Sequence, residues 1–189
     1  VVKIEKGMDR VVVTVKSGEQ YEYDGAYSAE ELKQICKDGD EVIGVHIYRN
    51  DAPIPEGVML VDTPGIDSTD DAHQLATEST LHLADVIFYM MDYNHVQSEV
   101  NLQFVKELKQ RNKTVYLVVN QIDKHKENEL SFENYKDSVK QSFFNWDIEV
   151  DGVYYTSLRM MNHPHNEIRS LEALITSIMK EKEQYVRTG

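Results

Sequence analysis

The sequence predicts an α/β fold in which a mostly parallel sheet lies between two layers of helices. From about residue 57 onward, unbroken apolar segments such as 86–91 and 114–119 alternate with amphipathic segments. Parallel strands covered on both faces read as continuous apolar runs, and parallel strands are usually joined by a helix. At 189 residues the chain is long enough for a single domain with one hydrophobic core.

Strand patterns begin at the first residues, where Val1–Ile4 already reads as a strand. Residues 11–15 and 20–24 alternate around a Ser17-Gly18 turn, which predicts a hairpin, and residues 43–47 predict a further strand. Residues 1–56 therefore form a β-rich segment, and residues 57–189 form the α/β core. The remaining strands are expected at 57–61, 86–91, 114–119 and 153–155.

Helices are predicted where apolar residues recur at helical spacing. Ser28 is a suitable N-cap for a short helix that reaches Cys36, because Glu31 stands three residues after it. The other helices are expected near 72–83, 100–108, 131–146 and 168–178.

Composition restricts the class of partner and the compartment. The net charge is −13, from 20 basic and 33 acidic residues, which argues against nucleic-acid binding and against a polybasic membrane patch on this segment. Cys36 is the only cysteine, so no intrachain disulfide can form, and a reducing cytoplasmic setting is expected. No segment is apolar enough over a sufficient length to span a bilayer.

The tetrapeptide Asp62-Thr63-Pro64-Gly65 closes the apolar run 57–61. An aspartate at a strand end can hold a water on a nucleotide's Mg²⁺, and a glycine lets a backbone N–H approach a terminal phosphate. The alternative is a β-turn that merely ends a strand, since proline and glycine are common there.

A second polar motif, Asn120-Gln121-Ile122-Asp123, closes the apolar run 114–119. A carboxylate can accept hydrogen bonds from the N1–H and the amino group of guanine, and adenine offers no such pair. Asn120 is expected to brace the loop. The alternative is a helix-capping loop. Together, the two motifs favour a guanine-nucleotide site at the carboxyl ends of the strands.

Tyr155-Thr156-Ser157-Leu158 closes the last predicted strand. A backbone N–H near Ser157 is placed to meet the guanine O6 atom, and the loop would shape the base pocket. This motif is weak by itself, and its value lies in its position.

The histidines and the acidic residues after Gly65 have simpler interpretations than metal sites. His163 and His165 lie close together, but no cysteine or helical partner supports a metal site, and a solvated loop is favoured. His73 is the one other histidine placed near the expected phosphate end. Asp67, Asp70 and Asp71 are interpreted as helix-capping residues rather than as a second cation site.

These motifs resemble the GTPase domain of bacterial dynamin-like proteins, and the resemblance is strongest from about residue 58 to 160. Asp62–Gly65 is similar to the third GTPase box, Asn120–Asp123 to the fourth, and Thr156–Leu158 to the fifth. The stretch from Asp62 to Val100 is the more specific part. The resemblance implies a P-loop NTPase-like three-layer fold, in which residues 1–56 form the extension between the second and third boxes.

The resemblance also implies the roles of particular residues. Asp62 would hold Mg²⁺ through water, with Thr63 and Gly65 at the catalytic phosphate end. Asn120, Gln121, Asp123, Ser157 and Leu158 would bind GTP or GDP. Ile66 stands where signalling GTPases place a glutamine, so a monovalent cation and a partner G domain are further candidates for water positioning.

Two departures from the family pattern limit what is expected of the chain. No Gly-x-x-x-x-Gly-Lys-Ser/Thr motif occurs, and the threonine of the second box is not found, so we expect a fragment truncated at its N-terminus that binds GTP weakly. Gln121 also replaces the usual lysine of the fourth box.

The expected parent protein is a GTPase that self-associates as a homodimer and remodels membranes. It would be cytoplasmic and peripheral at the inner face of the cell membrane, to which regions outside this chain would bind. Two alternatives stay open: a non-catalytic scaffold with a degenerate nucleotide site, and a GTPase of ribosome assembly or signalling.

Overall fold

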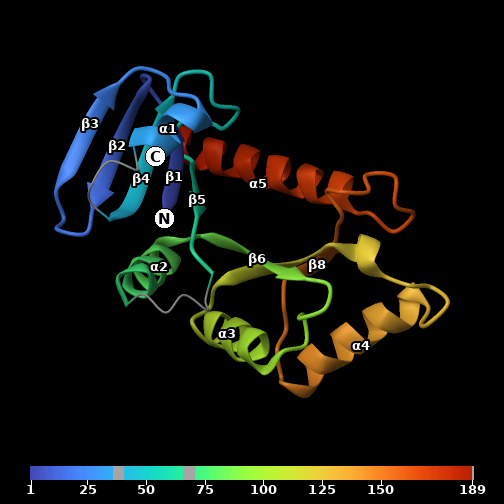
Figure 1. Cartoon of the computed structure of the whole chain (residues 1–189). Helices are drawn as coiled ribbons and strands as arrows, with labels where there is room; N and C mark the ends of the chain where they lie inside the picture. The colour runs from blue at the N-terminus through green and yellow to red at the C-terminus, as the bar shows by residue number, and fades with distance from the viewer. Residues whose placement is uncertain (36–40, 66–70, 189) are drawn as a thin grey trace. The chain divides into compact units, whose positions relative to one another are not determined.

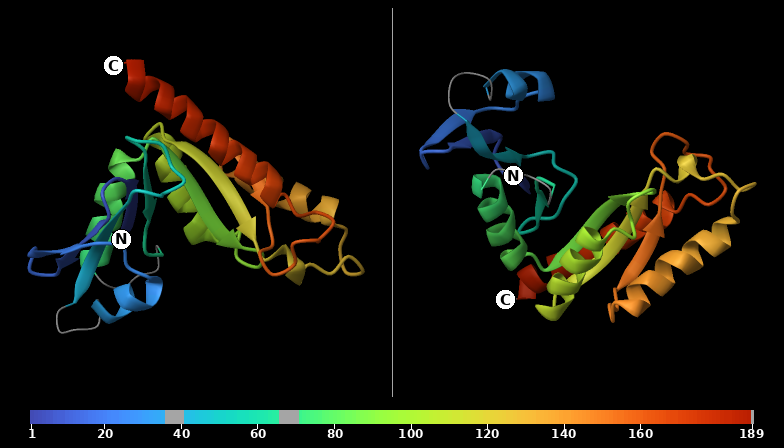
Figure 2. Two further views of the ribbon diagram at one scale, coloured as in Figure 1. Left: turned by 90° about the horizontal axis from the view of Figure 1, so that it is seen from above. Right: turned by 60° about the horizontal axis from the view of Figure 1, so that its bottom comes forward.

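The computed structural model describes residues 1–35, 41–65 and 71–188. These residues divide into two compact units, Val1–Leu83 together with Thr176–Gly189, and Ala84–Ile175. The elements of each unit are labelled in Figure 1, and Figure 2 gives two further views.

The first unit contains a five-stranded mixed sheet. Its strands follow the spatial order β3-β2-β4-β1-β5. β1 is parallel to β4 but antiparallel to β5, and β2 is antiparallel to both β3 and β4. The strands are β1 (Val2–Lys6), β2 (Arg10–Val15), β3 (Gln20–Asp24), β4 (Val42–Arg49) and β5 (Met59–Asp62).

Alternation along β2 gives this sheet one apolar face. Val11, Val13 and Val15 are buried, whereas the residues between them are half-buried. The other face carries polar and aromatic side chains that contact one another. Glu5 lies 2.6 Å from the Nε2 atom of His46, and the Arg10 guanidinium lies over the Tyr48 ring. One face of the sheet therefore packs in the core of the unit, while polar side chains on the opposite face pair with one another.

Two helices of the first unit agree with the sequence patterns. In α1 (Ala29–Ile35) the Glu31 N–H donates to Ser28 Oγ, and the Ser28 N–H donates to the Glu31 carboxylate over 2.7 Å. This reciprocal pair is the predicted capping box. The second helix, α2 (Asp71–Leu83), contacts β4.

The second unit is built on a parallel three-stranded sheet with the order β6-β7-β8. Its strands are β6 (Val86–Asp92), β7 (Thr114–Asn120) and β8 (Gly152–Tyr155). In the central strand β7, Val115, Leu117, Val118 and Val119 are at most 1% exposed. Burial of each such side chain contributes about 1.5–3 kcal/mol, so the sheet gives the loops at its edge a rigid base.

Helices cover both faces of this sheet (Figure 1), with α3 and α4 on one face and the first turns of α5 on the other. Ser98 caps α3 and Ser131 caps α4, each accepting a hydrogen bond from a backbone N–H three residues later. The helices are α3 (Glu99–Gln110), the 3₁₀ turn η1 (Ile122–Lys124), α4 (Phe132–Asn145) and α5 (Ile168–Thr188), of which the last belongs to the first unit from Thr176.

The structure confirms the predicted strands and helices, and the parallel sheet is found in the second unit. The expectation that the strand before Asp62 joins that parallel sheet is wrong, because β5 pairs with β1 in antiparallel orientation. Cys36, Asp67 and Asp70, and the side chains of Asp71 and His73, lie outside the described part of the chain. Among the helices that the structure describes, none is long and apolar enough to cross a membrane.

Candidate functional site

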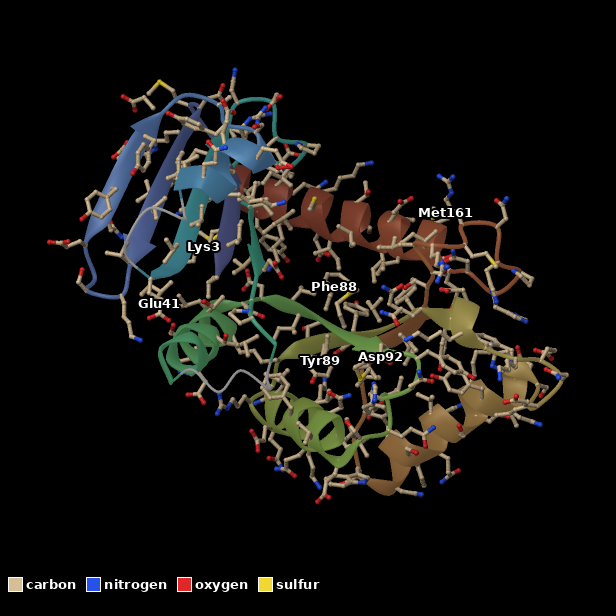
Figure 3. The ribbon with its side chains drawn as sticks, in the orientation of Figure 1. Lys3, Glu41, Phe88, Tyr89, Asp92 and Met161 are labelled. Carbon is tan, nitrogen blue, oxygen red and sulfur yellow. The ribbon has the colours of Figure 1, made fainter. Side chains whose placement is uncertain are left out.

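The carboxyl ends of β6, β7 and β8 lie at one edge of the second unit's sheet. Asp92, labelled in Figure 3, ends β6 and is the register partner of Asn120, which ends β7. Asp92 accepts a hydrogen bond from the Asn94 N–H and lies 2.6 Å from the Nδ1 atom of His95. The bond from His95 is the main reason that the pKa of Asp92 is lowered. This edge is the usual position for ligands in parallel sheets.

A left-handed residue turns the chain sharply after β7. Gln121 has a φ of 67° and precedes the 3₁₀ turn η1. Ile122 is fully buried, and its N–H donates to the carbonyl of Thr156 over 3.2 Å. The buried Ile122 anchors the turn to β8, so the polar residues on either side of it, Asn120 and Asp123, are fixed at the sheet edge.

Asn120 braces this edge, as the sequence predicts. Its Oδ1 atom accepts a hydrogen bond of 3.1 Å from the Thr156 hydroxyl, and Thr156 is 2% exposed. Its carbonyl accepts a hydrogen bond from the Tyr93 N–H. Asn120 thus links the ends of all three strands of the sheet.

Asp123 is joined to the loop that follows β8. The hydroxyl of Ser157, which is fully buried, donates to Asp123 Oδ1 over 2.6 Å. This bond lowers the pKa of Asp123, and the nearby charge of Arg159 acts in the same direction. The structure therefore brings together two of the residues predicted to contact the base, and it favours the ionised form of the carboxylate.

The loop from Ser157 to Met161 is held by a residue that the sequence patterns did not single out. The Asn166 side chain accepts a hydrogen bond from the Ser157 N–H and donates one of 2.7 Å to the Ser157 carbonyl. Within the loop, Leu158 is 66% exposed. Figure 3 labels Met161, at the far end of this loop. Only the folded chain reveals the role of Asn166, because no motif spacing marks it.

A second missed group is the aromatic cluster that supports η1. The side chain of His125 is 3% exposed; its Nδ1 atom lies 2.7 Å from the Tyr93 hydroxyl and its Nε2 atom 3.2 Å from Glu127. Tyr135 donates to the Tyr93 carbonyl, and its pKa is raised mainly by burial. Phe132 packs edge-on against His125. In the sequence, this cluster is signalled by the position of His125, two residues after Asp123.

The expectation of a solvated loop at 162–165 holds only in part, because Asn162 and Pro164 are exposed but His163 and His165 are not. Both rings are half-buried, and His165 stacks on Phe132 at 4.2 Å. Burial lowers the pKa of His163, which favours its neutral form. Aromatic packing thus explains the two histidines, and among the residues that the structure describes there is no cluster of three or more potential metal ligands.

The residues predicted for the phosphate end lie in the first unit. Asp62 is exposed at the end of β5, Thr63 and Pro64 are half-buried, and Gly65 is exposed. A Cβ atom added at Gly65 would meet no described atom within 4 Å, and Gly65 does not have a positive φ. The described protein atoms therefore give no reason for glycine at this position.

A shallow pocket of about 600 Å³ lies at the opposite end of the second unit's sheet, where β7 begins. Two of its charged residues already have structural roles, because Asp151 binds both Lys109 and the Val115 N–H. We therefore place the candidate site at the carboxyl edge and not in this pocket.

Comparison with known proteins finds relatives among bacterial GTPases and dynamin-like proteins. Dynamin-like protein A of Bacillus subtilis is 39% identical over 180 residues, which are 95% of this chain and 15% of that protein. GTPase Der of Campylobacter jejuni is 31% identical over 102 residues, covering 52% of this chain and 21% of that protein.

The fold is also found in solved structures. Two chains from an oligomerised bacterial dynamin pair, described as sensing and tethering membranes at long range, superpose with TM-scores of 0.54 and 0.57. Their sequence identities are 16% and 15%, and the matches cover 96% and 98% of this chain but 30% and 32% of those chains. Residues 1–123 match the family described as the Dynamin family. This chain therefore belongs to the dynamin family.

Proposed function

We propose that this chain supplies the guanine-recognising part of a dynamin-family GTPase. The observation that carries the proposal is the bond between Ser157 and Asp123, which holds an ionised carboxylate at the carboxyl edge of the sheet. Each carboxylate oxygen has two lone pairs, so Asp123 can accept the bond from Ser157 and the two N–H donors of guanine at once. Adenine offers no matching donors, and its binding would leave the carboxylate unpaired.

Other residues at the same edge of the sheet would make the remaining contacts to the base. Asn120 uses its amide oxygen for Thr156, which leaves its amide nitrogen to donate to the base or to a neighbouring loop. Gln121 is exposed and would lie beside the base, where the family usually has a lysine. Ser157 positions Asp123, and the backbone of Leu158 would meet the guanine O6 atom.

The phosphate end is assigned to the first unit. Asp62 carries the oxygen donors that Mg²⁺ prefers, and it would hold the ion through a bound water. Bound Mg²⁺ would neutralise charge on the phosphates during transfer. Thr63 and Gly65 would contact the terminal phosphate, and close approach of a ligand is consistent with the lack of any described atom within 4 Å of a Cβ placed at Gly65.

The activity of the whole protein is proposed from the family. The chain spans 15% of the length of the Bacillus subtilis relative, so most of such a protein lies outside it. We propose that the parent hydrolyses GTP and self-associates through its G domains at the inner face of the cell membrane, where it remodels the membrane. A monovalent cation or a partner G domain would help to position the attacking water.

The chain by itself is expected to bind GTP weakly and to hydrolyse it very slowly. Its sequence contains no Gly-x-x-x-x-Gly-Lys-Ser/Thr motif, and that motif provides most of the phosphate contacts in P-loop enzymes.

The test compares GTP with ATP in two proteins: this chain alone, and this chain joined to its natural upstream sequence. We expect the longer protein to bind GTP at least tenfold more tightly than ATP and to release phosphate only from GTP. Equal binding of both nucleotides would reject guanine recognition. Selective binding without any turnover would instead favour a non-catalytic scaffold.

A further inference from the structure

The end of β8 and the loop that follows it are joined to the segment before α5 by backbone and side-chain hydrogen bonds. The Glu167 N–H donates to the Tyr155 carbonyl, and the Glu167 carboxylate accepts a bond from the Tyr155 N–H. The Asn166 side chain binds both the N–H and the carbonyl of Ser157, which lies two residues after Tyr155. Asn166 and Glu167 thus act on this edge as a neighbouring strand would.

Asn166 makes more bonds than helix capping requires. Its Oδ1 atom accepts from the N–H of Ile168, the first residue of α5, and so satisfies one of the helix's unpaired N-terminal donors. Its Nδ2 atom additionally donates to the carbonyls of Ser157, Met160 and Met161, at 2.7, 3.2 and 3.4 Å. Those donations fix the Ser157–Met161 loop and contribute nothing to the cap.

The bonds to Asn166 determine which backbone N–H groups of the loop remain for a ligand. The Ser157 N–H is occupied by Asn166, and the Met160 N–H donates to Ser157 Oγ. Within the part of the chain that the structure describes, the N–H groups of Leu158 and Arg159 donate no hydrogen bond. These two donors lie directly after Ser157, whose hydroxyl holds Asp123.

We propose that Asn166 is a positioning residue for base specificity. It occupies the Ser157 N–H, presents the Leu158 N–H to the O6 atom of the purine, and keeps Ser157 in reach of Asp123. The acceptor that the loop selects is thus a carbonyl oxygen at position 6, which guanine has and adenine lacks. This inference rests on the proposed function, because Asn166 acts only through residues assigned to the base.

The decisive variants are Asn166→Asp and Asn166→Ala in the full-length protein. Aspartate keeps the acceptor that caps α5 but has no N–H₂ group to donate to the three carbonyls. We expect the ratio of the ADP to the GDP dissociation constant to fall roughly five- to tenfold in both variants, as for loss of one well-placed hydrogen bond. The affinity for ADP should stay within about twofold, because phosphate contacts are untouched.

The matched control is Asn162→Asp, which makes the same change at an exposed position directly after the Ser157–Met161 loop. It should leave the ratio of dissociation constants within about twofold of the unmodified protein. An Asn166→Asp protein with unaltered guanine preference would show that Asn166 is only a cap, and would overturn the inference. Equal binding of GDP and ADP by the unmodified protein would overturn the proposed function, and this inference with it.

Amide hydrogen exchange tests the same idea without any variant. In the ligand-free protein we expect the Ser157 N–H to be protected and the Leu158 N–H to exchange rapidly. GDP should protect the Leu158 N–H, whereas ADP at equal occupancy should not. Rapid exchange at Ser157, or equal protection of Leu158 by both nucleotides, would contradict the inference even if the variants failed to fold.

Discussion

The hydroxyl of Ser157 donates a hydrogen bond of 2.6 Å to the carboxylate of Asp123, although the two residues lie 34 positions apart in the chain. The bond crosses from the loop after β7 to the loop after β8. It joins two motifs that the sequence shows only as separate strand ends, and it is the basis of the first two predictions.

Asp123→Asn should exchange one base preference for another. An amide at this position can donate to the O2 atom of xanthine but cannot accept both donors of guanine. We expect GDP affinity in the full-length protein to fall at least tenfold while XDP affinity rises. Isothermal titration with both nucleotides measures this. The control Asp137→Asn, an exposed carboxylate on α4, should change neither affinity.

Ser157→Ala should raise the pKa of Asp123, because the hydroxyl is the main cause of its lowered value. A lowered pKa in the folded state stabilises the protein above the unfolded-state pKa, and that stability is lost as pH falls through the folded-state pKa. The stability lost through Ser157→Ala should therefore be largest near neutral pH and shrink under acidic conditions. NMR titration of Asp123, with urea unfolding at several pH values, measures both effects; a pH-independent difference would contradict the assignment.

Gln121→Val should destabilise the second unit. Gln121 has a φ of 67°, a conformation that costs a β-branched residue about 1–2 kcal/mol. Gln121→Gly should be neutral or slightly stabilising, since glycine adopts this conformation without strain. Denaturant unfolding compares the two variants. Gln110→Val, at an exposed position in α3, should cost only its helix propensity, less than about 1 kcal/mol.

Tyr93→Phe should destabilise the support beneath η1. The Tyr93 hydroxyl is the partner of His125 Nδ1, and the His125 side chain is 3% exposed. Loss of that partner leaves a buried nitrogen unpaired, at a cost of about 1–3 kcal/mol. The free energy of unfolding is the measurement. Tyr154→Phe removes a hydroxyl with no hydrogen bond among the described residues, and it should have a much smaller effect.

Gly65→Ala and Gly152→Ala should separate a ligand requirement from a packing requirement. A Cβ atom at Gly65 would meet no described atom within 4 Å, so the fold should keep its stability to within about 0.5 kcal/mol, while GTP turnover by the full-length protein falls. A Cβ atom at Gly152 would lie 3.0 Å from the Tyr116 ring, which should cost about 1–3 kcal/mol. Unchanged turnover in Gly65→Ala would remove Gly65 from the phosphate end.

The elements of the fold could be predicted from the sequence because each has a local cause. The unbroken apolar run of β7, the cap Ser28 and the alternation along β2 all depend on neighbours within a few residues. The orientation of β5 could not be predicted in this way. A short apolar strand looks the same in either orientation, and its antiparallel pairing with β1 depends on contacts far along the chain.

By itself, the sequence determined the strand-end motifs, the identity of the polar residues at Asn120, Asp123 and Ser157, and the family resemblance they carry. Only the tertiary structure decided that Ser157 bonds to Asp123, that His163 and His165 pack on aromatic rings, and that Asn166 holds the loop after β8. The physical reason is the range of the interactions. Periodicity and capping act between near neighbours, whereas a hydrogen bond between two loops exists only after the strands beneath them have been placed in register.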